Sequence, residues 1–185
     1  MDDWNQQCRG TAMDEDGEWA ASGKRQDDLL ASFMKDPFFD LPPPKSTGRD
    51  YFNMQWLQTH LDNVSKPSVL GRDDAADRDT QATLMALTVA SIAQAIVRHA
   101  PNTSEIAVCG GGVNNIFLMK KLHEMLPKIR IYDTAKLDLD PNAIEAVTFA
   151  WLAKQTLEGK PGSDASVTGA SNPGILGGLY QPYRL

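Results

Sequence analysis

Val108-Cys109-Gly110-Gly111-Gly112-Val113-Asn114-Asn115 places three consecutive glycines where a short apolar run gives way to an amphipathic segment. Glycine reaches backbone angles that other residues adopt only at a cost, and without a β-carbon it lets a ligand approach main-chain N–H groups. Such groups at a helix start favour anions, phosphate among them. The stretch is therefore a candidate nucleotide site, although the same glycines would also suit a tight turn with close packing, and both interpretations stay open.

The residues around the glycines have the pattern of a strand, a helix and a second strand. A short apolar run covers 106–109, a second strand is predicted at 129–132, and Pro127 ends the segment between them. That segment is predicted to be a helix from the spacing of Leu118, Leu122, Met125 and Leu126. A helical crossover joins parallel neighbours, and parallel sheets bind ligands beyond the carboxyl ends of their strands. The glycines lie at such an end.

Further helices are predicted upstream. The first 24 residues are expected to form a helix remnant followed by a loop, and a short helix covers 26–35. Thr47 and Asp50 resemble a capping box, which predicts a helix from there onward. A long buried helix ends near His99 and turns an apolar stripe inward, made of Leu84, Met85, Leu87, Val89, Ile92 and Ile96.

A last helix is predicted after the second strand, with Asp140 as N-cap and Pro141 at its first position. Its inward residues are expected to be Ile144, Val147, Trp151 and Leu152, and the glycine-rich tail is expected to end in one more strand. Glu145 shares a side of this helix with Phe149 and Leu152. It is either a solvated edge residue or, in a cleft, a hydrogen-bond partner for a group such as a sugar hydroxyl.

Size and composition narrow the class of protein. A chain of 185 residues fits one domain, and its net charge of −6 and pI near 5.0 argue against a nucleic-acid partner. The apolar stretch 82–97 is interrupted by polar residues and is shorter than a membrane span, so no membrane partner is expected. Cys8 and Cys109 are far apart and are expected to be reduced thiols. With no signal-peptide pattern at the start, the expected location is the cytoplasm.

Several familiar motifs are absent. The glycines lack the spacing of a dinucleotide fingerprint, although Asp133 stands near the place of its acidic residue, so an oxidoreductase is the weakest alternative. Lys45-Ser46-Thr47-Gly48 lacks the upstream glycine and spacer of a phosphate loop. An acidic cluster is predicted to form a solvated first turn of the long helix and not a metal site: Asp73, Asp74, Asp77 and Asp79.

Four motifs, taken in order, resemble the anhydro-N-acetylmuramic acid kinase family. They are Pro42–Asp50, the glycine cluster with Asn115, Glu145–Ala153, and Val167–Ala170. The resemblance runs over nearly the whole chain, and the ordered combination is far more specific than any one motif.

The resemblance implies an α/β fold: a ribonuclease H-like (actin-like ATPase) lobe with a mixed sheet flanked by helices, as in the sugar kinase, heat-shock-protein and actin superfamily. It implies an enzyme that uses ATP, with Mg²⁺, to open the 1,6-anhydro bond of anhydro-N-acetylmuramic acid and to phosphorylate the 6-oxygen. The product is N-acetylmuramic acid 6-phosphate, in murein recycling. Family members are typically homodimers.

Carried over residue by residue, the resemblance implies that Gly110, Gly111, Gly112 and Asn115 contact the nucleotide, at its adenosine end. It implies that Glu145 helps to bind the sugar. The segment Lys45 to Asp50 matches a family motif without a chemical role that we can assign, and its proline lead suggests a structural one.

The sequence also departs from the family pattern. The family's Gly-Thr-Ser-x-Asp-Gly phosphate loop and its Asp-Thr-Gly-Pro motif, whose aspartate activates water, are both missing, and Asp133-Thr134-Ala135 lacks the Gly-Pro. Met1-Asp2-Asp3-Trp4 resembles the helix that follows that aspartate. We therefore expect residues 1–185 to be a carboxy-terminal lobe that lacks the amino-terminal phosphate-loop lobe, has no catalytic residue of its own, and has little or no activity alone. The alternative is a non-catalytic module that kept an adenosine pocket.

Overall fold

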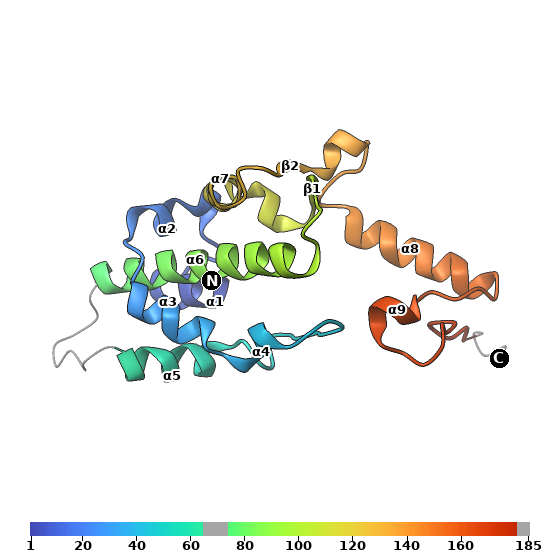
Figure 1. Cartoon of the computed structure of the whole chain (residues 1–185), viewed down its shortest axis with the longest axis horizontal. Coiled ribbons are helices and arrows are strands. Elements are labelled where there is room, and N and C mark those ends of the chain that lie inside the picture. The colour runs from blue at the N-terminus through green and yellow to red at the C-terminus, as the bar shows by residue number, and fades with distance from the viewer. Residues whose placement is uncertain (65–73, 181–185) are drawn as a thin grey trace, which may run out of the picture.

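The computed structural model of the chain describes residues 1–64 and 74–180 (Figure 1). Helices pack around one long central helix, a small parallel sheet lies at one end, and a helical arm projects beyond the sheet. The elements in chain order are α1 (Asp2–Arg9), η1 (Glu15–Gly17), α2 (Glu18–Ser22), α3 (Asp27–Met34), α4 (Pro37–Asp40), α5 (Met54–Val64), α6 (Asp74–His99), β1 (Glu105–Val108), η2 (Gly111–Asn114), α7 (Ile116–Met125), β2 (Arg130–Asp133), η3 (Thr134–Leu137), α8 (Ile144–Leu157) and α9 (Ala165–Thr168).

The central helix α6 is the long buried helix that the sequence predicts. It is long and apolar enough to cross a membrane by length and composition alone, but half of its most apolar window is buried within the protein. Its buried polar side chains form hydrogen bonds with neighbouring segments. The Gln81 amide donates to Asp14 at 3.2 Å, and Thr83 Oγ1 accepts the N–H of Gln26 at 3.0 Å. These contacts are those of a core helix.

Two clusters of buried side chains form the core on either side of this scaffold. One joins α6 to α7 and β2, and consists of Ala20, Met85, Val89, Ala93, Leu118, Leu122, Leu126 and Ile131. The other joins α6 to α1, α3 and α5, and consists of Trp4, Trp19, Leu29, Phe33, Leu57, Leu84 and Leu87. Each fully buried large side chain stabilises the fold by about 1.5–3 kcal/mol. Ile92 and Met125, expected inside, belong to neither cluster and are 37% and 49% exposed.

The first 24 residues have more structure than a helix remnant and a loop. The short helix η1 lies in this segment, and α2 follows it directly. The buried carboxylate of Asp14 accepts the N–H groups of Trp19 and Ala20, both at 2.9 Å, and so starts α2. Trp19 is therefore placed in the core, where it is buried.

The helix predicted over 26–35 is α3, but the start predicted for the next helix is wrong. Instead of beginning at Thr47 and Asp50, α5 begins at Met54. Asn53 Oδ1 accepts the N–H of Trp56 at 3.0 Å and therefore caps the helix, which displaces its start from the capping-box pattern.

The sheet has two strands in the part of the chain that the structure describes, where a mixed sheet was expected. β1 and β2 are parallel, as predicted, with Ile106 opposite Ile131 and Val108 opposite Asp133. The strand expected in the tail is not found between residues 74 and 180, where α9 and irregular backbone follow α8. The α/β class with flanking helices is confirmed at this coarser level.

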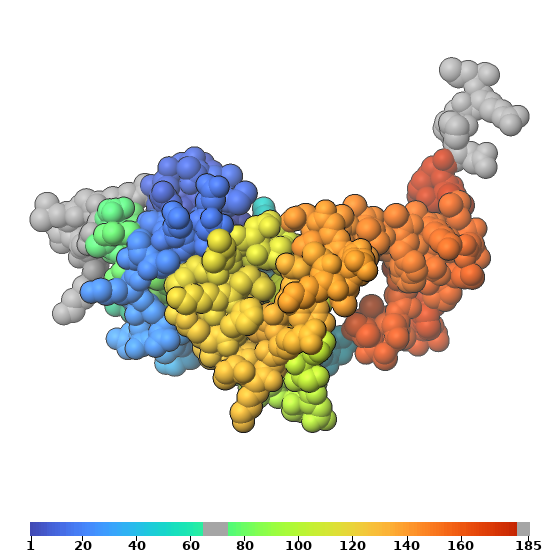
Figure 2. All heavy atoms as spheres, turned by 90° about the horizontal axis from the view of Figure 1, so that it is seen from above, coloured from blue at the N-terminus to red at the C-terminus, as the bar shows by residue number. Residues whose placement is uncertain are grey.

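The arm formed by α8 and α9 corrects two predictions. α8 begins at Ile144, with Ala143 as N-cap, although Asp140 Oδ1 accepts the N–H of Asn142 at 2.9 Å as an N-cap would, because the carbonyl of Pro141 accepts the N–H of Gly110 from outside the helix. None of its residues is buried, and Val147 and Trp151, expected to face inward, are 51% and 50% exposed. Both views show the arm reaching away from the body, so no core lies beneath it (Figures 1 and 2).

Candidate functional site

The glycine cluster lies at the carboxyl end of β1, as the strand pattern predicts. Gly110 has φ +82°, a left-handed value that favours glycine, so the turn itself explains this residue. Gly111 has no such angle, and a β-carbon added to Gly110 or Gly111 would meet nothing within 4 Å. Close packing therefore does not account for Gly111, and open space lies in front of it.

The main-chain N–H groups of the cluster differ in their hydrogen bonds. The N–H of Gly110 donates to the carbonyl of Pro141 at 2.9 Å, whereas those of Gly111 and Gly112 have no protein acceptor among the described residues. These are first-turn amides, which a helical segment cannot satisfy by itself. This glycine corner, residues 110–115, therefore has two adjacent backbone N–H groups that could donate to a ligand.

Asn115 has a structural role in the same corner. Its Oδ1 accepts the N–H of Leu118 at 2.8 Å and caps α7. A β-carbon on Gly17 would collide with this side chain, which shows how closely η1 lies against it. The Asn115 amide nitrogen has no hydrogen-bond partner among the described residues and is the group that could donate to a ligand.

The loop before α8 ties the glycine corner to Glu145. Besides the bond from Gly110 to Pro141, the Asn114 amide donates to Asn142 Oδ1 at 3.2 Å. Glu145 follows in the first turn of α8, and its side chain is exposed. The structure therefore brings the glycines and the start of α8 to one surface, but does not place Glu145 in an enclosed cleft.

Asp133 lies at the same edge, because it pairs with Val108 in the strand register. Its Oδ1 accepts the N–H of Ala135 at 3.0 Å and caps η3. This local cap accounts for the carboxylate that the oxidoreductase alternative would need for a ribose.

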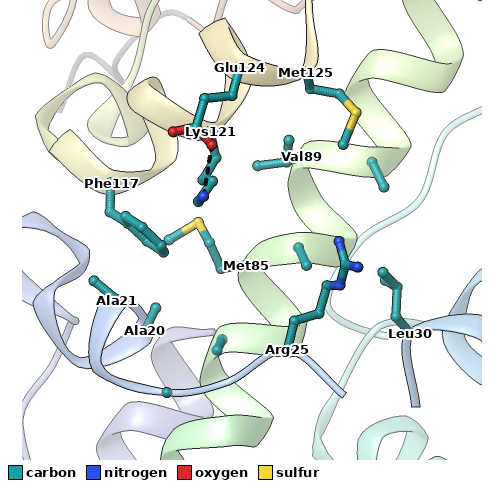
Figure 3. Close-up of a pocket in the computed structure, with 14 residues that line it drawn as sticks. Ala20, Ala21, Arg25, Leu30, Met85, Val89, Phe117, Lys121, Glu124 and Met125 are labelled. Atoms are coloured by element: carbon teal, nitrogen blue, oxygen red, sulfur yellow. Dashed lines mark hydrogen bonds and ion pairs between the residues drawn. The ribbon is translucent and has the colours of Figure 1, made fainter. Parts of the chain in front are cut away.

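The largest cavity described lies elsewhere. It has a volume of about 490 Å³ and lies between α2, α6 and α7, with Met85, Phe117, Met125 and five alanines in its lining (Figure 3). Lys121 and Glu124 form an ion pair at 2.7 Å on its wall, and the hydrogen bond from Lys121 lowers the pKa of Glu124. No predicted site residue lines this cavity or two smaller ones, of about 360 and 210 Å³.

The acidic cluster before the long helix offers no metal site among the residues described. Asp73 lies outside them, while Asp74 and Asp77 are in the first turn of α6, where the prediction put them. Asp79 Oδ1 accepts the N–H of Lys24 at 2.7 Å. Across residues 1–64 and 74–180, no group of three His, Cys, Asp or Glu side chains could hold a metal ion.

Comparison with known proteins finds similarity along almost the entire chain. The family model for anhydro-N-acetylmuramic acid kinase matches residues 1–182. Proteins with that name from Xanthomonas campestris pv. campestris (strain 8004) and Cupriavidus metallidurans are 44% and 42% identical over 180 residues, or 97% of this chain and 45% and 46% of theirs. The protein of that name from Nitrosospira multiformis is 43% identical over 180 residues, which are 97% of this chain and 46% of that protein. The chain spans about half the length of the curated relatives that it matches.

Proposed function

The chain belongs to the anhydro-N-acetylmuramic acid kinase family, and we propose that it forms the carboxy-terminal, nucleotide- and sugar-binding lobe of such a kinase. In the proposed reaction of the complete enzyme, water adds to C1 of the anhydro sugar and the 1,6-anhydro bond opens. The γ-phosphoryl group of ATP passes to the 6-oxygen, which leaves ADP and N-acetylmuramic acid 6-phosphate. The aspartate that takes the proton from water is expected outside this chain.

One observation carries the proposal for the nucleotide. Gly111 is a glycine that neither a left-handed backbone angle nor a close neighbour requires, and its N–H is one of two adjacent donors without a protein acceptor in the described chain. A bound nucleotide that approaches the backbone would account for both facts, because only glycine permits that approach. Gly110 and Gly112 shape the turn around it, and Asn115 holds the start of α7 in place.

Glu145 is the proposed sugar ligand. Its carboxylate is exposed and lies three residues after Asn142, which is bonded to the glycine corner. A carboxylate accepts hydrogen bonds from sugar hydroxyl groups, and it would do so more strongly once a second lobe excludes water from the cleft.

The proposed fold is a ribonuclease H-like lobe whose sheet continues beyond β1. Parallel sheets are normally covered on both faces and contain more than two strands, so a parallel pair by itself suggests a part of a larger sheet. The apolar but unburied α8 supports the same view, since a helix that is apolar all round is typical of a protein core.

The remaining expectations for the complete kinase are also proposals. We expect a homodimer in the cytoplasm, and the net charge of −6 supports the absence of a nucleic-acid partner. Mg²⁺ is expected to arrive with ATP. The residues described bring together no group that could hold it, so we assign it no ligand in this part of the chain.

Replacement of Gly111 tests the nucleotide site. Gly111→Ala adds a β-carbon into open space and should leave the free energy of unfolding within about 0.5 kcal/mol of wild type. The affinity for a non-hydrolysable ATP analogue, measured by calorimetry, should fall at least about tenfold, because the new methyl group keeps the nucleotide from the backbone. Gly174→Ala is the matched control, since Gly174 also has an ordinary φ and no neighbour within 4 Å. Equal affinity of both variants for the analogue would refute the site.

Replacement of Glu145 tests the sugar site separately. Glu145→Gln should weaken binding of anhydro-N-acetylmuramic acid about tenfold and leave nucleotide binding unchanged, because a charged acceptor is lost. Glu18→Gln changes another exposed first-turn glutamate, in α2, and should have no effect on either ligand.

A further inference from the structure

The end of the arm rests on the triproline loop, which runs from residue 41 to residue 48 after α4. A β-carbon on Gly169 would lie 2.8 Å from Cγ of Pro44 and 3.7 Å from its Cβ, so the backbone of Gly169 lies against the ring of Pro44 with no room for a side chain between them. Gly169 also has φ +74° as the C-cap of α9. Figure 1 shows the loop after α4 reaching toward α9. The contact joins two sequence motifs, Pro42–Asp50 and Val167–Ala170, that have no assigned role.

Lys45 fastens the triproline loop to the body. Its Nζ donates to the carbonyl oxygens of Phe38 and Phe39 at 2.8 and 3.0 Å and lies 4.8 Å from the centre of the Phe38 ring. These carbonyls are in the last turn of α4, where the Phe38 oxygen also accepts the N–H of Leu41 at 3.3 Å, and carbonyl oxygens at a helix end are acceptors for a cation. The loop therefore has a defined position relative to α4.

Asp36 in turn holds α4 in the core. Its carboxylate caps α4 by accepting the N–H of Phe38 at 2.9 Å, and it accepts Nε1–H of Trp56 at 2.8 Å and the hydroxyl of Tyr51 at 3.0 Å. Asp36 is 8% exposed. A continuous set of contacts thus runs from the buried carboxylate through α4 and Lys45 to Pro44.

The arm is also attached at its base, where Gly110 donates to Pro141. Within the arm, the N–H of Gly162 donates to the carbonyl of Gly174 at 3.0 Å, and Thr156 Oγ1 donates to the carbonyl of Leu176, so its segments fold back on α8. Because α8 has no buried residue, its direction depends on such end contacts more than on packing. Glu145 lies between the two attachments.

We propose that the triproline loop is a seat for the arm and that Lys45 is a positioning residue, which through this seat sets the direction of α8 and of Glu145. The consequence for sugar binding rests on the proposed function of Glu145. The docking of the arm on the loop does not depend on that function and can be tested without a ligand.

Hydrogen exchange of the whole chain tests the seat. Gly169→Ala should raise the exchange rates of the Gly162 and Thr168 amides about tenfold, because the added methyl group displaces the arm from Pro44. Gly10→Ala is the matched control: Gly10 is also a helix C-cap, at φ 74° and ψ 8° against 74° and 7° for Gly169, but has no neighbour within 4 Å. Unchanged exchange of the arm amides in Gly169→Ala would overturn the seat.

Binding measurements test Lys45 as a positioning residue. Lys45→Met should weaken the affinity for anhydro-N-acetylmuramic acid about fivefold and leave that for the ATP analogue unchanged, and Lys45→Arg, which still donates to carbonyls, should restore it. Lys160→Met removes an exposed lysine of the arm as a control. An equal loss for both ligands, or no loss for either, would overturn the role of Lys45. If Glu145→Gln also leaves sugar binding unchanged, the proposed sugar site fails instead, and the exchange rates alone decide about the seat.

Discussion

The side chain of Asn115 lies directly against the backbone of Gly17, with no room for a β-carbon between them. A β-carbon on Gly17 would also lie 2.8 Å from Cβ of Phe117, and Gly17 has φ +75°. Since Asn115 caps α7 through Leu118, this contact couples the turn before α2 to the start of α7 and so to the glycine corner. The contact between η1 and the start of α7, which are far apart in sequence, therefore helps to fix the position of the glycine cluster.

Gly17→Ala should therefore destabilise the protein strongly. The left-handed backbone angle costs about 1 kcal/mol for alanine, and overpacking adds about 1–3 kcal/mol, so the free energy of unfolding should fall by about 2–4 kcal/mol. Urea unfolding followed by circular dichroism measures it. Gly10→Ala has the same angle without a neighbour and should lose only about 1 kcal/mol. Equal losses in the two variants would show that the contact with Asn115 is absent in solution.

Asp36→Asn should lower the free energy of unfolding by about 1–3 kcal/mol at pH 7, because hydrogen bonds to a charged acceptor become bonds to a neutral amide. Although burial by itself raises the pKa of Asp36, the hydrogen bonds from Trp56, Phe38 and Tyr51 together lower it below 3.8. Asp164→Asn serves as the control, since Asp164 caps the exposed α9. A loss no larger than that of the control would contradict the central place given to Asp36.

Acidification should destabilise the protein in two steps. Burial lowers the pKa of His60 below 6.5 despite the opposing attraction of Asp36, so the unfolded chain takes up the proton first and stability falls as the pH drops below about 6.5. Asp36, with its lowered pKa, contributes stability above 3.8 that is lost as the pH falls toward its folded value. Thermal unfolding between pH 8 and 3 measures both steps. Asp36→Asn should make the lower step smaller without removing it, since the pKa values of Glu124 and Asp164 are lowered too. A wild-type midpoint that does not change between pH 7 and 5 would refute the upper step.

The unit from β1 to β2 could be predicted from the sequence because its signals are local. Leu118, Leu122 and Leu126 recur at helical spacing, Pro127 ends the helix, and two short predicted strands flank it. The start of α8 could not be predicted in the same way. Asp140 and Pro141 have the local pattern of a helix start, but a long-range bond from Gly110 uses the Pro141 carbonyl.

The sequence motifs name the residues of the candidate site, but they do not predict how these residues are arranged in space. The resemblance of the motifs identified Gly110 to Gly112, Asn115 and Glu145, whereas the open space before Gly111 and the cap made by Asn115 depend on where η1, α7 and the loop before α8 meet. The sequence of α8 has apolar residues on all sides, and burial within this chain was expected from this pattern. Apolar residues on all sides of a helix indicate burial, but they do not say which polypeptide covers it.

The exposed apolar residues of the arm should make the chain self-associate. Val147 and Trp151 are 51% and 50% exposed and are one turn apart on the same side of α8, and adjacent exposed apolar groups favour protein contacts. Each of the two side chains buried in such a contact contributes about 1.5–3 kcal/mol, so the double change Val147→Ser and Trp151→Ser should weaken association about 100-fold or more.

Sedimentation equilibrium over a range of protein concentrations measures this effect. Lys154→Ser changes an exposed polar residue of the same helix and should leave the association constant unaltered. If the double variant and wild type associate equally, the arm is not the contact surface. A wild type that is monomeric at all concentrations would contradict self-association through the arm.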